Sequence, residues 1–283
     1  MQSERGFEYG VKHIISPLSG SVRDVLLSIL QLSSDEIEFL IHLGAIYLNH
    51  SRIQENVSVS AGDYLRVHTK PRRFPKGNVD FTKCITFENE HFVVVNKVSG
   101  IPVHGSVDNI RENLQSYMEE VLGVKLYVTH RLDVPTNGLI VYAKTIEFQT
   151  AFNKLLIARE IKKIYRAKIE GEAPAEKILK HYMEPSPRAP KVVSLEPKDK
   201  WQECVLEILE SRKIDDETSG LRIHLHTGRT HQIRAQLGYE KSPIVGDHAY
   251  GAQKRWPEER IELTACELEF KNPLTGENHH FKI

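Results

Sequence analysis

Apolar and polar positions in the first seventy residues predict two short helices and a small sheet. From residue 22 to residue 30 the apolar positions recur at helical spacing and define one buried stripe. Ser33 and Glu36 have the spacing of a capping box, which opens a second helix that ends at Gly44. Short strands are predicted at residues 45–48 and 64–68, before and after a turn at 61–63.

The pattern changes beyond residue 85, where longer β-type segments and helical segments interleave. Residues 92–95 form a run of β-preferring side chains, and residues 164–169 alternate between polar and apolar as a strand does. Apolar residues between 148 and 156 recur at helical spacing. Further strands are predicted near 204–209, 221–226 and 263–270. Because no strict strand–helix repeat appears, we expect an α+β fold with a mixed, mostly antiparallel sheet flanked by helices.

A basic segment with two prolines separates these two patterns. Its cations are Lys70, Arg72, Arg73 and Lys76. The segment has no periodicity, so we interpret it as a linker, although cations beside an aromatic residue are also suited to touch RNA phosphates. The predicted division is a small α+β domain at 1–69, the linker at 70–84 and a larger domain at 85–283.

Composition limits the class of protein. The formal net charge of the 283 residues is zero, so any polyanion must be bound by local basic patches. Cys84, Cys204 and Cys266 are far apart and odd in number, which argues against a disulfide framework and fits a reducing compartment. The first twelve residues lack the apolar core of a signal peptide, and no apolar run reaches membrane-spanning length. We therefore expect a cytoplasmic protein with no membrane segment.

Residues 130–138 place a cation, an acid and a turn between two strand-like runs. Asp133 lies two residues from Arg131, Pro135 fixes its own backbone torsion, and Asn137-Gly138 can adopt positive φ. A carboxylate on so rigid a loop is pre-positioned for chemistry. The same residue types also form ordinary turns, in which Asp133 would only accept backbone N–H bonds.

This loop resembles the signature of the RluA-like pseudouridine synthases, in which the Asp is catalytic. The shared residues are His130-Arg131-Leu132-Asp133 with Thr136 and Gly138. Further segments match that family in the same order: Asn96-Lys97, then residues 100–104, 163–167, 227–234, 243–247 and 250–251. Ordered motifs spread over residues 93–251 are far more specific than any one of them.

The resemblance implies an isomerase that converts uridine to pseudouridine. The C1′–N1 bond breaks, the uracil turns, and C5 joins C1′; no atom is added and no redox step occurs, so no cofactor is expected. Asp133 would either attack C1′ or take a proton from C2′, and the sequence leaves both routes open. By the same resemblance Arg229 pairs with Asp133, and Tyr165 packs on the uracil and helps with the C5 proton. The alternatives are a structural ion pair for Arg229 and a core aromatic for Tyr165.

A base inside a helix or stack must be extruded before it can reach Asp133. Arg131 resembles the arginine that fills the space left by the flipped base, although it could instead only balance Asp133. Lys97, Lys163 and Arg234 are candidate phosphate contacts, against the alternative of solvated surface charges. The expected partner is structured ribosomal or transfer RNA, bound by a monomer.

The first seventy residues resemble the small RNA-binding domain named after ribosomal protein S four, particularly at 44–49 and 62–67. The second helix departs from that pattern. Residues 33–38 read Ser-Ser-Asp-Glu-Ile-Glu, where the RNA-binding versions usually carry arginines or lysines. Since phosphate binding needs cations, a domain that only packs against or orients the catalytic one is the alternative.

Two histidines at alternate strand positions, His224 and His226, share a face, and with His231 they are candidate metal ligands. No fourth ligand stands at a recognisable spacing, so no metal is expected. Two further hypotheses are a non-catalytic RNA-binding protein that keeps the fold and a metal-dependent hydrolase that uses the histidines. Asn137 stands where the family usually has serine; because asparagine suits the turn, activity is expected to survive.

Overall fold

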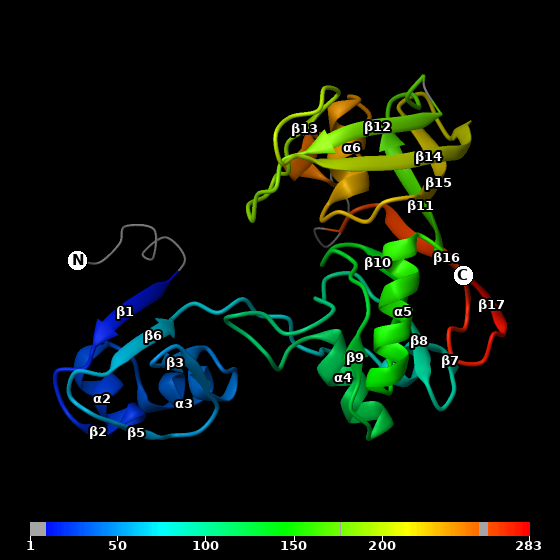
Figure 1. The fold of residues 1–283 in the computed structure, drawn as a ribbon. Coiled ribbons are helices and arrows are strands. Elements are labelled where there is room, and N and C mark those ends of the chain that lie inside the picture. Colours follow the sequence, from blue (N-terminus) through cyan, green and yellow to red (C-terminus); the bar gives the residue numbers. More distant parts are fainter. Residues whose placement is uncertain (1–9, 176, 255–259) are drawn as a thin grey trace. The chain divides into compact units, whose positions relative to one another are not determined.

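The fold is taken from a computed structural model, which describes residues 10–175, 177–254 and 260–283 (Figure 1). Contacts divide the chain into two compact units: residues 1–79 with 104–120, and residues 80–103 with 121–283. The first nine residues, part of the stretch that argued against a signal peptide, lie outside the described residues. The division at residues 69 and 84 rests on sequence pattern and stays a prediction.

The first unit combines short helices with antiparallel strands. Its elements are β1 (Val11–Ile15), β2 (Gly20–Ser21), α2 (Val22–Ile29), α3 (Ser34–His42), β3 (Ile46–Leu48), β4 (Ser51–Ile53), β5 (Ser58–Val59) and β6 (Tyr64–His68). The main sheet has the order β1-β6-β3-β4. The predicted capping box is confirmed, because the Ser33 hydroxyl accepts from the Glu36 N–H while the Glu36 carboxylate accepts from the Ser33 N–H.

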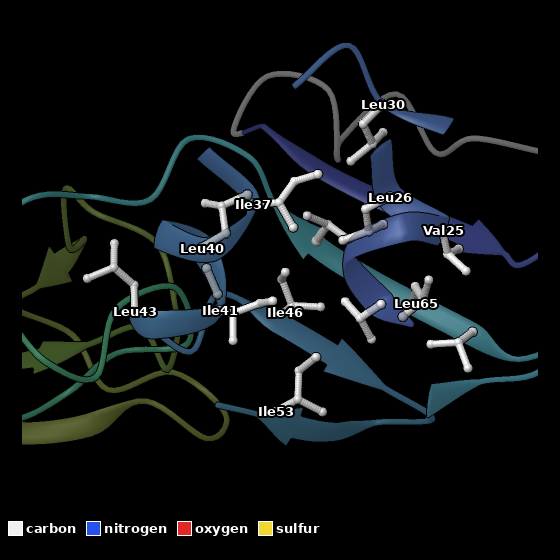
Figure 2. Packing of buried hydrophobic residues seen from close by; sticks show 14 residues of the cluster. Val25, Leu26, Leu30, Ile37, Leu40, Ile41, Leu43, Ile46, Ile53 and Leu65 are labelled. Atoms are coloured by element: carbon white, nitrogen blue, oxygen red, sulfur yellow. The ribbon is translucent and has the colours of Figure 1, made fainter. Parts of the chain in front are cut away.

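The apolar stripes of the two helices meet the sheet in one core. Figure 2 shows Leu26 and Ile37 from the helices beside Ile46 and Leu65 from the strands. None of these four side chains has any exposed surface. Burial of these aliphatic groups is what holds so small a unit together. The resemblance of this unit to the ribosomal-protein domain stays a prediction.

The remaining elements belong mostly to the second unit. They are η1 (Phe81–Cys84), β7 (Ile85–Glu88), β8 (Phe92–Lys97), α4 (Leu114–Leu122), β9 (Tyr127–Val128), β10 (Asn137–Ala143), α5 (Ile146–Ala158), β11 (Lys162–Glu170), β12 (Ile178–Met183), β13 (Val193–Ser194), β14 (Gln202–Lys213), β15 (Thr218–Leu225), α6 (Gln232–Tyr239), η2 (His248–Tyr250), β16 (Leu263–Lys271) and β17 (Asn278–Lys282).

The described residues of the second unit build one sheet of eleven strands. Its main path is β13-β12-β14-β15-β11-β16-β10-β8-β7, with β17 beside β16 and β9 beside β10. Among these strands only β10 and β16 pair in parallel. The expected α+β class with a mixed, mostly antiparallel sheet is confirmed.

Helices pack on this sheet through aromatic and small apolar side chains. Phe148 of α5 stacks on Phe92 of β8 with ring centroids 4.8 Å apart, in a cluster that also holds Phe270. Ala235 of α6 packs with Cys204 of β14. Among the described helices, none is both long and apolar enough to cross a membrane.

Candidate active site

A buried lysine holds the loop that carries Asp133. Lys97, at the end of β8, donates from Nζ to the carbonyl oxygens of Thr136 at 2.7 Å, Val134 at 3.0 Å and Val98 at 3.1 Å. Two of these carbonyls belong to the turn that follows Asp133. An ammonium has three donors, so this side chain is fully used, and the backbone beside Asp133 is fixed.

Lys97 therefore does not have the expected role of a phosphate contact. Only 1% of its surface is exposed, so it has no ammonium surface to offer to RNA. Burial lowers the pKa of Lys97 to about 7, while the Asp133 carboxylate acts in the opposite direction. The structure makes it a support for the loop.

His130 anchors the other end of the loop. The Val141 N–H donates to its Nε2 at 3.2 Å. Burial, helped by the nearby Lys163 charge, lowers the pKa of His130 to about 3, so this imidazole stays neutral at physiological pH. A neutral ring that accepts a backbone hydrogen bond is a structural element of the loop.

The sheet aligns the loop with Tyr165 through one row of residues. Gly138 of β10 is opposite Ala265 of β16, and Ala265 is in turn opposite Tyr165 of β11. Gly138 has φ +114, and a Cβ there would lie 2.3 Å from the Ala265 oxygen. Only glycine allows this close approach. The glycine of the signature thus sets the distance between the Asp133 loop and the strand that carries Tyr165.

Arg234 of α6 is the cation that pairs with Asp133. Its Nη1 lies 3.3 Å from Asp133 Oδ2. The same guanidinium donates from Nε and Nη2 to Asp247 at 2.7 and 2.9 Å, in a bidentate pair whose carboxylate is 2% exposed. Burial opposes the charge of Arg234, but the hydrogen bonds to Asp247 and the two carboxylates raise its pKa overall. Asp247 therefore fixes the cation, and the cation faces Asp133.

This pairing differs from the expected one. The family resemblance predicts that Arg229 pairs with Asp133, and Arg234 is a predicted phosphate contact. Arg229 is exposed, and its backbone N–H donates to the Gln232 side chain at 3.0 Å. No ion pair between Arg229 and Asp133 is recorded among the described residues. The structure brings Arg234 to the carboxylate instead, because α6 starts directly after the turn that holds Arg229.

Two more side chains, His231 and Tyr250, complete the surroundings of Asp133, and the sequence predicts a place beside Asp133 for neither of them. His231 Nε2 lies 4.0 Å from Asp133 Oδ2, and its Nδ1 is 2.9 Å from the Tyr250 hydroxyl. Tyr250 also lies beneath the Arg234 guanidinium, 5.1 Å from ring centroid to carbon. His231 has φ +59 at the N-cap of α6. Neither sequence spacing nor periodicity indicates this cluster.

Tyr165 is buried, with 7% of its surface exposed. Burial and then the Asp133 charge raise the pKa of its hydroxyl, so the phenol stays protonated at neutral pH. Its environment combines an apolar sheet face with a neighbouring carboxylate, which fits either a core aromatic or a group beside a bound base.

The other predicted RNA contacts, Arg131 and Lys163, lie around the turn before α6. Arg131 is exposed and, among the described residues, its guanidinium reaches Thr230 Oγ1 alone, at 3.4 Å. Lys163 is mostly buried, which lowers its pKa, and its Nζ lies 3.2 Å from where a Cβ of Gly228 would be. These cations border the turn that carries Arg229.

The sequence profile of the RNA pseudouridylate synthase family matches residues 91–239, more than half of the 283 residues. That range carries Asp133, Tyr165 and Arg234. The chain therefore belongs to the RNA pseudouridylate synthase family, which confirms the resemblance drawn from the motifs.

Individual proteins agree with this assignment. The chain is 35% identical over 218 residues to RNA pseudouridine synthase 6, chloroplastic, of Arabidopsis thaliana, covering 69% of this chain and 46% of that protein. It is 31% identical over 220 residues to ribosomal large subunit pseudouridine synthase D of Vibrio cholerae, covering 71% and 67%. The chain thus spans about half the length of the plant relative.

Among solved structures the fold is similar to that of human RNA pseudouridylate synthase domain containing 4. The TM-score is 0.58 at 20% sequence identity, over 72% of this chain and 88% of that one. This likeness concerns the fold.

Proposed function

We propose that this chain isomerises specific uridines to pseudouridine in structured ribosomal or transfer RNA, with Asp133 as the catalytic carboxylate. The observation that carries the proposal is the Asp133–Arg234–Asp247 arrangement inside the segment that matches the family. The guanidinium is held by the buried Asp247 carboxylate and contacts Asp133 Oδ2, so it fixes the position of the Asp133 carboxylate. An ionised carboxylate is what both attack on C1′ and proton removal from C2′ require.

The remaining residues have roles that follow from their surroundings. Tyr165, buried and protonated, is suited to pack on the uracil and to exchange a proton near C5. Arg131, exposed on the same loop as Asp133, is suited to occupy the position of the extruded base. Isomerisation adds no atom and transfers no electron to an acceptor, so the proposed reaction uses no cofactor. A cytoplasmic location and a monomeric state are parts of this proposal that rest on the sequence.

The test compares wild type, Asp133→Asn and Asp216→Asn in cells that lack the native chain. Asp216 is exposed and pairs with Lys213 on the surface, so it is a control for loss of a carboxylate. Pseudouridines are mapped by carbodiimide labelling and primer extension. We expect discrete signals in ribosomal or transfer RNA with wild type and Asp216→Asn, and their loss with Asp133→Asn. Signals that persist with a folded Asp133→Asn protein would overturn the proposal.

A further inference from the structure

Three side chains on neighbouring strands gather away from Asp133. His224 lies on β15, Glu207 stands directly opposite it on β14, and His226 follows at the end of β15. Opposite residues of antiparallel strands point to the same face, and so do residues two apart on one strand. The three side chains therefore share one face.

That face is the reverse of the one that carries the candidate active site. Ile164, the partner of His224 across β11, precedes Tyr165, so Tyr165 points to the opposite side. Cys204, on the other face of β14 from Glu207, packs against Ala235 of α6. The histidine cluster therefore takes no part in the proposed isomerisation.

The distances in the cluster suit one small cation. Glu207 Oε2 is 3.2 Å from His226 Nε2 and 3.8 Å from His224 Nδ1. One ligand atom from each residue lies within 4.8 Å of the others. Two atoms each bound to a zinc ion at about 2.1 Å are roughly 3.4 Å apart in tetrahedral geometry. The observed spacings bracket that value, so small rotations of the side chains would bring all three onto one ion.

The surroundings of the three residues leave room for an ion but place positive charge nearby. All three residues are half-buried, so an ion and its water can reach them. Lys162 and Lys163 add positive charge nearby, which weakens binding, although Lys162 is itself paired with Glu269 at 3.5 Å.

We propose that Glu207, His224 and His226 form a binding site for a divalent transition metal ion of the Zn²⁺ class, with water completing the coordination. Two neutral imidazoles and one carboxylate are a ligand set that holds such ions. No bond within the chain changes; each imidazole only keeps its proton on the ring nitrogen that does not face the metal. The bound ion would link β14 to β15 immediately before the turn at 227–229.

The third ligand differs from the one that the sequence predicts. His231, the predicted third ligand, lies beside Asp133 instead. Glu207 is seventeen positions before His224, and only the register of β14 with β15 brings it to the site. No spacing rule would find it.

The test uses the full chain, stripped of metal with a chelator and then titrated with ZnCl₂ by calorimetry and with CoCl₂ by visible absorption. We expect one equivalent of Zn²⁺ per chain and d–d bands of Co²⁺ bound to nitrogen and oxygen. We expect the affinity to fall roughly tenfold or more in His226→Ala and Glu207→Gln, and a larger fall in the double variant His224→Ala/His226→Ala. Zinc should also raise the Tm of wild type but not of the double variant.

The control is His280→Ala, since His280 is an exposed histidine beside a carboxylate outside the cluster, 3.6 Å from Glu267. It should bind Zn²⁺ as wild type does. Circular dichroism confirms that each variant is folded. Either of two results would overturn the proposal: no saturable binding to wild type, or the same affinity in the double variant. In both cases the cluster would be a Glu–His hydrogen-bonding group without metal.

Discussion

The charged groups around Asp133 fall into a buried region and an exposed region. In the buried region Lys97, Arg234 and Asp247 are at most 6% exposed, and each is bonded to fixed partners. In the exposed region Arg131 has one long contact to a hydroxyl. Arg229 forms hydrogen bonds to Gln232 through its backbone N–H and carbonyl, and no bond of its guanidinium is seen among the described residues. Basic side chains around Asp133 are therefore either buried and held by hydrogen bonds or exposed and largely unrestrained.

The difference follows from solvation. A buried charge costs several kcal/mol unless partners replace its water, so it persists only with a complete set of hydrogen bonds, and that set fixes its position. An exposed guanidinium keeps its water and its freedom, and it can exchange that water for phosphate oxygens. We infer that the buried region positions Asp133 and that the exposed region contacts RNA. The predictions below test this separation.

The largest effect is expected from Arg234→Met. The substitution leaves Asp247 as a buried carboxylate without its bidentate partner, which should lower the free energy of unfolding by about 3–5 kcal/mol. It also removes the cation beside Asp133, so release of tritium from RNA labelled at uridine C5 should be lost. Urea unfolding and the tritium assay measure the two effects.

The control for this substitution is Arg222→Met. Arg222 is also paired with carboxylates, Glu267 and Glu210, but its side chain is 31% exposed. Loss of the Arg222 side chain should lower the free energy of unfolding by about 1 kcal/mol and leave the rate of tritium release unchanged. Equal costs for the two substitutions would contradict the distinction between a buried and a partly exposed arginine.

A smaller effect is expected from Lys97→Met. Methionine fills much of the same space but removes one donor from each of the carbonyls of Val98, Val134 and Thr136, although Val134 keeps the Gly100 N–H. The free energy of unfolding should fall by about 2 kcal/mol. Because the loop loosens, kcat for pseudouridine formation should fall while the KM for RNA changes little. The exposed Lys162→Met is the matched control. A raised KM with unchanged kcat would instead support direct RNA contact by Lys97.

Substitutions in the exposed region should affect binding alone. Arg131→Ala and Arg229→Ala should unfold like wild type in urea, because neither side chain supports a buried group. Each should weaken RNA binding and lower the slope of log K against log salt by about one. Filter binding at several salt concentrations measures this, with the exposed Arg212→Ala of β14 as control. Loss of stability on par with Lys97→Met would show that these residues belong to the buried region.

Much of the fold follows from local pattern. The capping box of Ser33 and Glu36, the strands from 92 and 164 onward, and the helix around Phe152 all appear where apolar spacing predicts them. Helix α6 does not, because Gln232 to Leu237 are buried on every side and show no amphipathic stripe.

The site is less predictable than the fold. The motif placed Arg229 and Arg234 five positions apart, and nothing in that spacing says which one faces Asp133. Which arginine faces Asp133 depends on where α6 begins, after its N-cap His231, and on Asp247, which lies in a later segment of the chain. Likewise, Lys97 looks like any basic residue at the end of a strand. Its burial depends on a loop that lies almost forty residues further along the chain.

The smallest expected effect is a pH dependence of the free energy of unfolding, which tests whether burial destabilises the charged form of Lys97. Burial lowers its pKa from 10.5 to about 7, with Asp133 opposing the shift. Between those two pH values the unfolded chain binds a proton at Lys97 that the folded chain lacks, so the free energy of unfolding rises with pH. The cost of burying the charged lysine is present in full only below about pH 7. The free energy of unfolding of wild type, relative to Lys97→Met, should therefore increase by about 1 kcal/mol from pH 6 to pH 8. Urea unfolding at three pH values measures this. A constant difference would mean that the three carbonyls and Asp133 fully replace water around the ammonium, so that burial alone does not separate the two regions.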